Sequence, residues 1–262
     1  MATVADILNF MESLAPAHMA EDWDKIGLNC GHKNQKVKKI LVALDPFPHV
    51  CQEAIDMGAD LLLTHHPLIW EPGFVTDETT QGQCILTLTE NKIAHISAHT
   101  NLDCAPGGVN DTLANALGMT DVKVIAPKGT DSHGNNWGLL RMGNVEPQPL
   151  STFTSTVKNA LQCDGLRFVD GGKQVCRVAV GGGACGSELK SAANAGCDTF
   201  VTSDVKYNQF WEAKELGVNL IDAGHFHTEN PVCAVLAKKL AVAFPDTEIR
   251  LSEIHRDCIK YC

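Results

Sequence analysis

Histidines and carboxylates cluster just after three apolar segments of this chain of 262 residues. The segments "DLLLT", "AHISA" and "NLIDAG" read as buried strands, and each runs directly into a histidine. Functional groups collect past the carboxyl ends of parallel strands, so these side chains are expected to meet. Imidazole and carboxylate together, with no thiolate pattern, suit zinc, manganese, iron, cobalt or nickel. The residues placed in this way are His65, His66, His99, Asp103, His225, His227 and Glu229.

The vicinal pair His65-His66 is the most specific of these features. Neighbouring side chains on a strand point to opposite faces, so both cannot bind one ion in the same way while the strand stays regular. At a strand end they can diverge and serve two ions. Pro67 keeps His66 extended, and a carboxylate could bridge two ions ~3.5–4 Å apart, as in two-metal hydrolytic sites.

A structural role is the alternative for each histidine taken alone, since a lone histidine in an apolar segment is usually structural. Burying two adjacent imidazoles without partners is costly, which favours a functional pair at positions 65 and 66. Asp204 is interpreted either as a residue supporting the site or as a helix cap. The remaining histidines fall outside the pattern and are interpreted as ordinary polar residues: His18, His32, His49, His133 and His255.

The chain contains two copies of one pattern. Residues 39–66 align without a gap with residues 177–204, and the shared Gly-x-Asp ends in Asp60 and Asp198. Each copy reads as strand, turn, helix, Gly-x-Asp and strand, which is a βαβ unit with buried parallel strands. The feature His-x-x-x-acid recurs after both copies. The repetition predicts two similar α/β domains.

We therefore expect an α/β fold with mixed or parallel sheets, in which two domains face each other across a dinuclear metal site. Residues 1–125 are assigned to the first domain and residues 126–262 to the second, with a C-terminal segment able to pack back on the first. The polar stretch 127–138 is interpreted as a junction or loop. Thr3-x-x-Asp6 resembles a capping box at the start of an amphipathic helix.

Composition excludes several classes of protein. The net charge of −10 argues against a nucleic-acid surface, which needs basic patches. No run of ~18 apolar residues is present, so no membrane span is expected. The N-terminus reads as a helix and not as a signal peptide. The eleven cysteines contain no Cys-x-x-Cys pair and are predicted to be free thiols in a reducing compartment. These features indicate a cytoplasmic protein.

One glycine motif offers a competing interpretation. Gly181-x-Gly183-x-x-Gly186 follows a predicted strand, and Asp204 comes 18 residues later, as in a dinucleotide-binding fingerprint. The pattern alone is weak and has no glycine counterpart in the first copy, so we expect no organic cofactor. The alternative use of this turn is to hold a phosphate or other anion of the substrate.

The sequence resembles the GTP cyclohydrolase I type 2-like family, also called the Ngg-interacting-factor-three-like family. The resemblance covers essentially the whole chain. Its most specific parts are the double histidine and the segment Gly-His-x-x-Thr-Glu. The segments that carry it, in this order, are "AEDWDKIGLNCG", "LLLTHHPL", "AHTNLD", "VTSDVKYNQFWEAKELG" and "DAGHFHTE".

The resemblance implies two linked α/β domains with a dinuclear metal centre between them, and a homohexameric ring. Two divalent ions per chain are implied, of undetermined identity. His99 is implied to lie near the metals, as a ligand or an acid/base group. Lys25, Ser203 and Asn208 depart from the usual family pattern, which affects substrate contacts and not the ligand set. The implied metal ligands are His65, His66, Asp103, His225 and Glu229.

The family name implies hydrolytic opening of a purine ring. Water activated by a metal would attack C8 of GTP, formate would leave after a second hydrolysis, and His99 could move the proton while Glu229 is essential. A phosphoester or an amide-like bond suits the same centre. The sequence thus predicts a metal-dependent hydrolase of a nucleotide-like or other anionic substrate. The alternative is a non-catalytic metal-binding adaptor or metal-storage ring.

Overall fold

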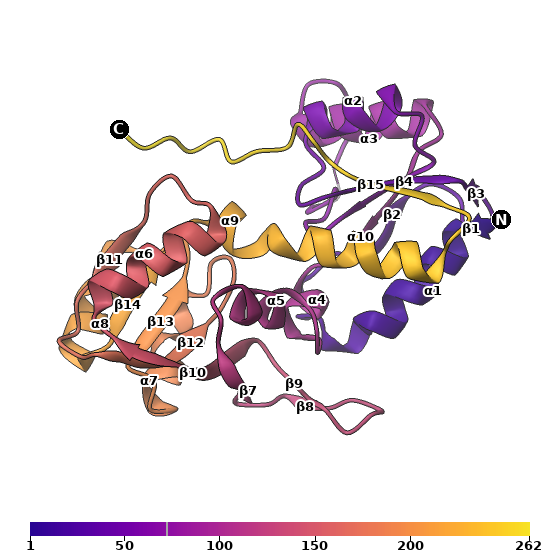
Figure 1. Cartoon of the computed structure of the whole chain (residues 1–262). Coiled ribbons are helices and arrows are strands. Elements are labelled where there is room, and N and C mark those ends of the chain that lie inside the picture. The colour runs from indigo at the N-terminus through magenta and orange to yellow at the C-terminus, as the bar shows by residue number, and fades with distance from the viewer. Residues whose placement is uncertain (72) are drawn as a thin grey trace. The chain divides into compact units, whose positions relative to one another are not determined.

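The computed structural model describes residues 1–71 and 73–262. Contacts divide these residues into two compact units, each built of helices and a central sheet (Figure 1). The first unit comprises Met1–Leu102 and Cys233–Arg256, and the second comprises Asp103–Val232 and Asp257–Cys262. The expected α/β class with mixed sheets is confirmed.

The sheet of the first unit has the strand order β15-β4-β5-β6-β2. β15, β4, β5 and β6 are parallel, and β2 is antiparallel to β6. The carboxyl ends of these four parallel strands therefore lie at one edge of the sheet. The strands are β2 (Gly27–Cys30), β4 (Lys39–Ala43), β5 (Leu61–Thr64), β6 (Ala94–Ser97) and β15 (Glu248–Leu251), and β1 (Ala2–Thr3) pairs separately with β3 (Lys36–Val37).

Helices cover both faces of this sheet. Leu41, Ala43 and Leu62 pack with apolar residues of α2 and α3, while their neighbours Ile40 and Val42 are buried on the other face. Figure 1 shows α1 and α10 on the opposite side of the strands from α2 and α3. The helices are α1 (Val4–Leu14), α2 (Pro48–Asp56), α3 (Thr80–Glu90) and α10 (Pro231–Ala243), with the short η1 (Ala17–Met19). The first unit ends at Leu102 within α4 (Thr100–Cys104), and the second unit begins at Asp103.

The sheet of the second unit has the order β11-β14-β13-β12-β10-β7. β12, β13 and β14 are parallel, and antiparallel strands complete both sides. The three parallel strands correspond to β4, β5 and β6, as the repeat predicts. The strands are β7 (Thr120–Ile125), β10 (Leu140–Gln148), β11 (Arg167–Val169), β12 (Val175–Val180), β13 (Thr199–Thr202) and β14 (Asn219–Asp222).

This second sheet is also covered on both faces. Val178, Val201 and Ile221 pack with α5 and α6, while Ala179 and Phe200, one residue along their strands, pack with α7 and α8. The alternation follows from the two-residue period of a strand. The helices are α5 (Val109–Ala116), α6 (Leu150–Leu161), η2 (Gly186–Glu188), α7 (Leu189–Asn194), α8 (Tyr207–Leu216) and α9 (His225–Glu229).

Two local predictions have clear outcomes. The capping box is confirmed, because Thr3 and Asp6 exchange both of its hydrogen bonds at the start of α1. The stretch 127–138, expected as a loop, instead forms a hairpin in which β8 (Gly129–Thr130) pairs with β9 (Asn136–Trp137). The carboxylate of Asp131 accepts backbone amides within the turn, which explains the order of this polar segment.

The remaining expectations concern cysteines and membranes. All eleven cysteines are described, and none forms a disulfide. Across residues 1–71 and 73–262, no helix is both long and apolar enough to cross a membrane.

Candidate metal centre

Three histidines of the first unit meet at the carboxyl edge of its sheet. The ring centroids of His65 and His66 lie 4.9 Å apart, and the ring of His99 lies 5.2 Å and 5.4 Å from them. One ring nitrogen of each residue lies within 4.8 Å of the other two. His65 is fully buried and His99 nearly so, whereas His66 is half-buried. β5 ends just before the pair and β6 just before His99, so the parallel pairing of these strands brings the three together.

The vicinal pair diverges toward the two strands that flank β5. The Nδ1 of His65 lies 2.8 Å from the carbonyl oxygen of Ala98, which follows β6. The Nδ1 of His66 lies 2.6 Å from Oδ1 of Asp45, which follows β4. Carbonyl and ionised carboxylate oxygens only accept, so both Nδ1 atoms carry a proton and donate. In the neutral ring each Nε2 then carries a lone pair, as a metal-ligating histidine requires.

His99 is oriented by the same kind of bond. Its Nδ1 lies 2.9 Å from Oδ1 of Asp24, whose Oδ2 accepts the amide of Thr100 at 2.9 Å and also its hydroxyl. Burial raises the pKa of Asp24, but the hydrogen bonds from His99 and Thr100 outweigh it and lower that pKa to about 2. Asp24 is therefore an ionised acceptor at neutral pH.

Asp45 is ionised for a similar reason. Burial raises the pKa of its carboxyl group, but hydrogen bonds from His255 and His66, together with their charge, hold the pKa well below its usual range. Both oxygens of this carboxylate face a histidine nitrogen.

Two tryptophans flank His99 with their edges. The ring centroids of Trp23 and Trp70 lie 5.9 Å and 5.3 Å from that of His99, nearly perpendicular to it in the case of Trp70. Trp23 remains 58% exposed and Trp70 45% exposed. His99 is thus bordered by accessible indole rings, while its Nδ1 is held by Asp24 on the protein side.

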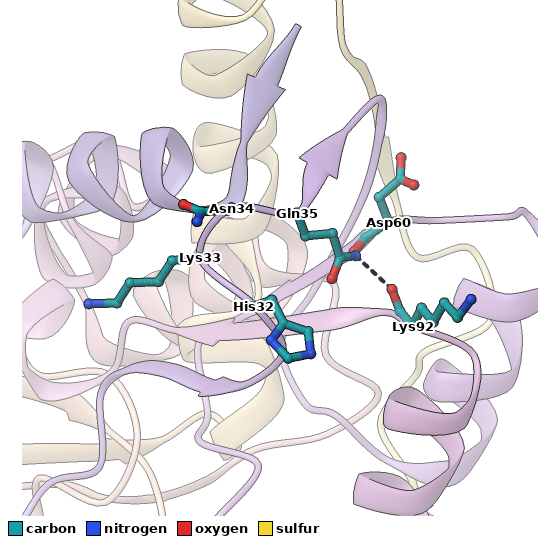
Figure 2. A pocket seen from close by; sticks show the side chains of 6 residues that line it. All are labelled: His32, Lys33, Asn34, Gln35, Asp60 and Lys92. Atoms are coloured by element: carbon teal, nitrogen blue, oxygen red, sulfur yellow. Dashed lines mark hydrogen bonds between the residues drawn. The ribbon is translucent and has the colours of Figure 1, made fainter.

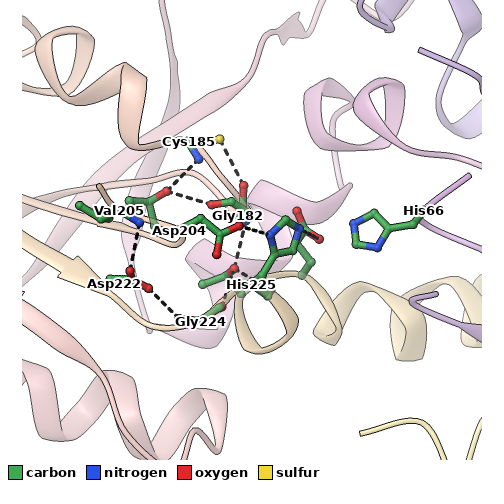
Figure 3. A network of polar contacts seen from close by, with 12 residues as sticks. His66, Gly182, Cys185, Asp204, Val205, Asp222, Gly224 and His225 are labelled. Carbon is green, nitrogen blue, oxygen red and sulfur yellow. Dashed lines mark hydrogen bonds and ion pairs between the residues drawn. The ribbon is translucent and has the colours of Figure 1, made fainter. Parts of the chain in front are cut away.

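The second unit carries a histidine and a carboxylate on one face of α9. The Nε2 of His225 lies 3.0 Å from Oε2 of Glu229, four residues later, as the helical period requires. The Nδ1 of His225 lies 2.7 Å from Oδ2 of Asp204, and Figure 3 shows the two side chains turned toward each other. This bond supports the interpretation of Asp204 as a residue supporting the site. It also directs the Nε2 of His225 toward Glu229.

The predicted ligand Asp103 lies in α4 and is nearly fully buried. Its carbonyl oxygen accepts from the Asn110 side chain at 3.2 Å. Burial raises the pKa of the Cys185 thiol well above its usual range, and the charges of Asp103 and Glu229 raise it further. The two carboxylates therefore share one region of the second unit with a thiol that stays protonated, which makes Cys185 a poor metal ligand.

The glycine motif makes room for Glu229. A Cβ on Gly183 would lie 2.0 Å from Oε1 of Glu229, and the φ of Gly183 is +64°. The amide of Gly183 donates to the hydroxyl of Thr228 at 3.0 Å, and the amide of Gly182 donates to Oδ1 of Asn110 at 2.7 Å. These amides are used within the protein, so the interpretations as a dinucleotide or phosphate site are disfavoured. The motif instead permits close packing of α9.

His227 does not join the candidate ligands. Its Nδ1 lies 3.2 Å from the carbonyl oxygen of Leu161, and its Nε2 lies 3.3 Å from Oδ2 of Asp257. With both nitrogens engaged, it has a structural role in the second unit.

Sequence reasoning missed three supporting residues, Asp24, Asp45 and His255. Asp45 had a usable signal, because it ends the segment "LVALD" in a strand predicted to neighbour the histidine pair. Asp24 lies in the segment "AEDWDKIGLNCG" that carries the family resemblance, but nothing in its spacing connects it to His99, and His255 had no signal. The interpretation of His255 as an ordinary polar residue was wrong, because its side chain is buried against Asp45.

A separate hollow of about 760 Å³ in the first unit contains no candidate ligand. Figure 2 shows Gln35 among the lining residues, and the Gln35 amide donates to the carbonyl oxygens of Asp60 and Lys92 at 2.9 Å and 2.6 Å. These bonds tie Gln35 to the residues that precede β5 and β6, which gives the side chain a structural role. Its lining residues are His32, Lys33, Asn34, Gln35, Asp60 and Lys92.

The chemistry of the donor sets fits a divalent metal. Four of the imidazoles have their Nδ1 hydrogen-bonded to an acceptor oxygen, and the candidate ligands also include carboxylates. The fold and these donor groups define, as a class, an α/β protein with histidine and glutamate clusters that could hold a metal ion. The family model DUF34/NIF3 (NGG1p interacting factor 3) matches residues 2–258. The chain belongs to this family.

Individual relatives extend over the full chain. A protein of Clostridium perfringens named GTP cyclohydrolase 1 type 2 homolog is 32% identical, over 98% of each chain. Among solved structures, a Bacillus cereus protein related to NIF3 matches with a TM-score of 0.93 and 26% identity, covering 100% of this chain and 99% of that one. A hypothetical protein of Staphylococcus aureus matches with a TM-score of 0.93 and 28% identity, over 99% of each chain.

Proposed function

We propose that the protein is a dinuclear-metal hydrolase whose substrate is nucleotide-like or otherwise anionic. The observation that carries the proposal is shared by four histidines, each of which has its Nδ1 hydrogen-bonded to an acceptor oxygen, as is usual for histidines that ligate a metal through Nε2. The ligands are His65, His66, Asp103, His225 and Glu229, which hold two divalent ions.

In this proposal the two units are domains that face each other and share the metal site. The first contributes the vicinal histidines, and the second contributes Asp103, His225 and Glu229. The repeat supports this arrangement, because each copy places its donor groups after the carboxyl ends of its parallel strands. A homohexameric ring is part of the proposal and rests on the family resemblance.

Each residue has a defined task. Bound divalent ions supply Lewis-acid chemistry and a lowered pKa for water. Glu229 would hold the metal with its carboxylate, and the buried setting of its side chain favours a bound partner. His99 accepts and returns a proton at Nε2, since Asp24 holds its Nδ1 proton and stabilises the charged ring.

Local charge selects the substrate. The whole chain carries −10, so its net field does not attract an anion. Two divalent ions would bring about +4 against the two carboxylates of the proposed ligand set, Asp103 and Glu229, which favours an anionic ligand bound directly to the ions. The name carried by the relatives makes GTP the first compound to assay.

The test combines metal analysis with turnover. Protein reconstituted with manganese or zinc is analysed for metal content and assayed on GTP and on a panel of phosphoesters. We expect about two ions per chain and turnover that chelation abolishes. Glu229→Gln should lose one ion and its activity, whereas Glu90→Gln, at an exposed position on α3, should match the wild type. Full metal loading without turnover would favour the adaptor or storage role.

A further inference from the structure

We propose that His255 is a positioning residue that fixes the Asp45 carboxylate and, through it, the ring of His66. The inference rests on the proposed metal centre, because it assigns His255 the task of presenting the Nε2 of His66 to a metal ion. His255 comes just after β15 and lies outside the sequence motifs of the site.

The geometry is a carboxylate held from both sides. Oδ1 of Asp45 lies 2.6 Å from the Nδ1 of His66, and Oδ2 lies 2.8 Å from the Nε2 of His255. Rotation of the carboxylate about its χ2 angle would break at least one of these bonds. With its plane fixed, Asp45 accepts from His66 in only one direction, which sets the orientation of that ring.

The proton positions follow from the same contacts. An ionised carboxylate has no proton to give, so both histidines must donate to Asp45. The Nδ1 of His66 therefore carries a proton, and in the neutral ring its Nε2 does not. The Nε2 of His255 is the donor on the other side, and its Nδ1 lies 3.3 Å from the Nε2 of His49. This state of His66 is the one that a metal ligand needs.

Asp24 provides an internal comparison within the same unit. It too holds a candidate histidine with one oxygen, while its second oxygen accepts from Thr100. Thr100 is adjacent in sequence to His99, so both hydrogen bonds to Asp24 come from neighbouring residues. For Asp45 the second hydrogen bond comes from His255, 210 positions further along the chain. His255 thus does for Asp45 what Thr100 does for Asp24.

The segment that carries His255 is itself anchored. The His255 side chain is 5% exposed, and its backbone amide donates to the hydroxyl of Ser252 at 3.1 Å. That hydroxyl bonds to Glu53, whose other oxygen accepts the amide of Glu253 at 2.8 Å. The ring centroid of Phe47 lies 6.0 Å from that of His255. A residue merely following an edge strand would not need these contacts, so they favour a positioning role.

The first test measures metal affinity by competition with a chromophoric chelator. Removal of a residue that orients a metal ligand typically costs about 10–100-fold in affinity. We expect a loss of this size for one ion in His255→Leu. His255→Gln should restore much of it, because the glutamine amide can donate to Asp45 from nearly the same place. His32→Leu, at an exposed position of the same unit, is the matched control and should bind like the wild type.

The second test uses the metal-free protein, so it does not depend on the proposed function. Long-range ¹H–¹⁵N NMR spectra report which nitrogen of His66 carries the proton. Wild type and His255→Gln should show the proton on Nδ1, and His255→Leu should show a mixture of both forms. Thermal unfolding of each metal-free variant identifies any general loss of stability.

The outcomes separate the two proposals. Wild-type affinity in His255→Leu, or a lowered melting temperature with an unchanged His66 proton, would overturn the positioning role. A wild type that binds no metal refutes the metal centre, and the NMR result then decides the link between His255 and His66 by itself.

Discussion

Asp60 and Asp198 occupy the same hydrogen-bonding position in the two sheets. Oδ2 of Asp60 accepts the amides of residues 38–39 at 2.7 Å and 3.0 Å. The carboxylate of Asp198 accepts the amides of residues 176–177 at 3.0 Å and 2.7 Å. In each copy the Gly-x-Asp residue thus joins the start of one parallel strand to the start of the next. The repeat in the sequence therefore corresponds to the same pair of backbone-to-carboxylate hydrogen bonds in both sheets.

These carboxylates should matter for stability to a similar extent. Asp60→Ala and Asp198→Ala each leave two backbone amides without their acceptor, which typically costs about 1–3 kcal/mol. Urea denaturation should show a lower free energy of unfolding for both variants. Asp246→Ala, at an exposed position, is the control and should unfold like the wild type. A loss in only one variant would contradict the equivalence of the two positions.

The sequence was informative wherever a signal is local. Gly-x-Asp and His-x-x-x-acid lie within a few residues, so their spacing maps directly onto a turn or one face of a helix. The pairing of His225 with Glu229 on α9 is of this kind. The parallel order of β4, β5 and β6 also followed, because buried strands alternate with helices.

The supporting residues could not be read in this way. The bond from His99 to Asp24 spans 75 positions, and that from His255 to Asp45 spans 210. No periodicity connects such positions, since the chain path between them is fixed only by the packing of the whole unit. The glycine motif was misleading for a related reason. Its spacing is that of a nucleotide loop, but its conformation serves the close approach of Glu229.

Gly183 should tolerate no side chain. In Gly183→Ala the new Cβ would displace the Glu229 carboxylate, and the backbone would be strained at φ +64°. We expect less metal per chain, as measured by elemental analysis, together with a lower melting temperature. Gly172→Ala is the matched control, because it has φ +82° but no atom within 4 Å of the added Cβ. Equal metal loss in both variants would assign the effect to backbone strain alone.

Trp23 and Trp70 should report binding at His99. Their rings lie within 5.9 Å of the His99 ring, so a paramagnetic ion such as copper(II) held by these histidines should quench their fluorescence. The double variant Trp23→Phe/Trp70→Phe should lose most of the quenching during titration. Trp211→Phe is the control and should retain it, because both indole rings next to His99 are still present in this variant. The reverse pattern would place the ion away from His99.

Another buried histidine, His95, contacts the end of β5. The hydroxyl of Thr64 donates to the carbonyl oxygen of His66 at 2.6 Å and therefore accepts from the Nε2 of His95 at 2.7 Å. His95 is fully buried, and its Nδ1 has no hydrogen-bond partner among the residues described. Charging this ring would place an unsatisfied donor in the interior, which is costly.

Stability should therefore fall as the pH falls below neutrality, with His95 as a named contributor. Burial lowers the pKa of His95 from 6.5 to about 3. Between these values the unfolded chain binds a proton at this residue and the folded chain does not. The free energy of unfolding then decreases with falling pH by up to about 1.4 kcal/mol per unit.

His95→Gln can still donate to Thr64 but cannot titrate, so its urea-unfolding free energy should fall less steeply between pH 6.5 and about 4.5. The measurement is made with a chelator present, and His133→Gln, at an exposed position, should keep the wild-type slope. Parallel slopes for wild type and His95→Gln would show that His95 is already charged in the folded protein.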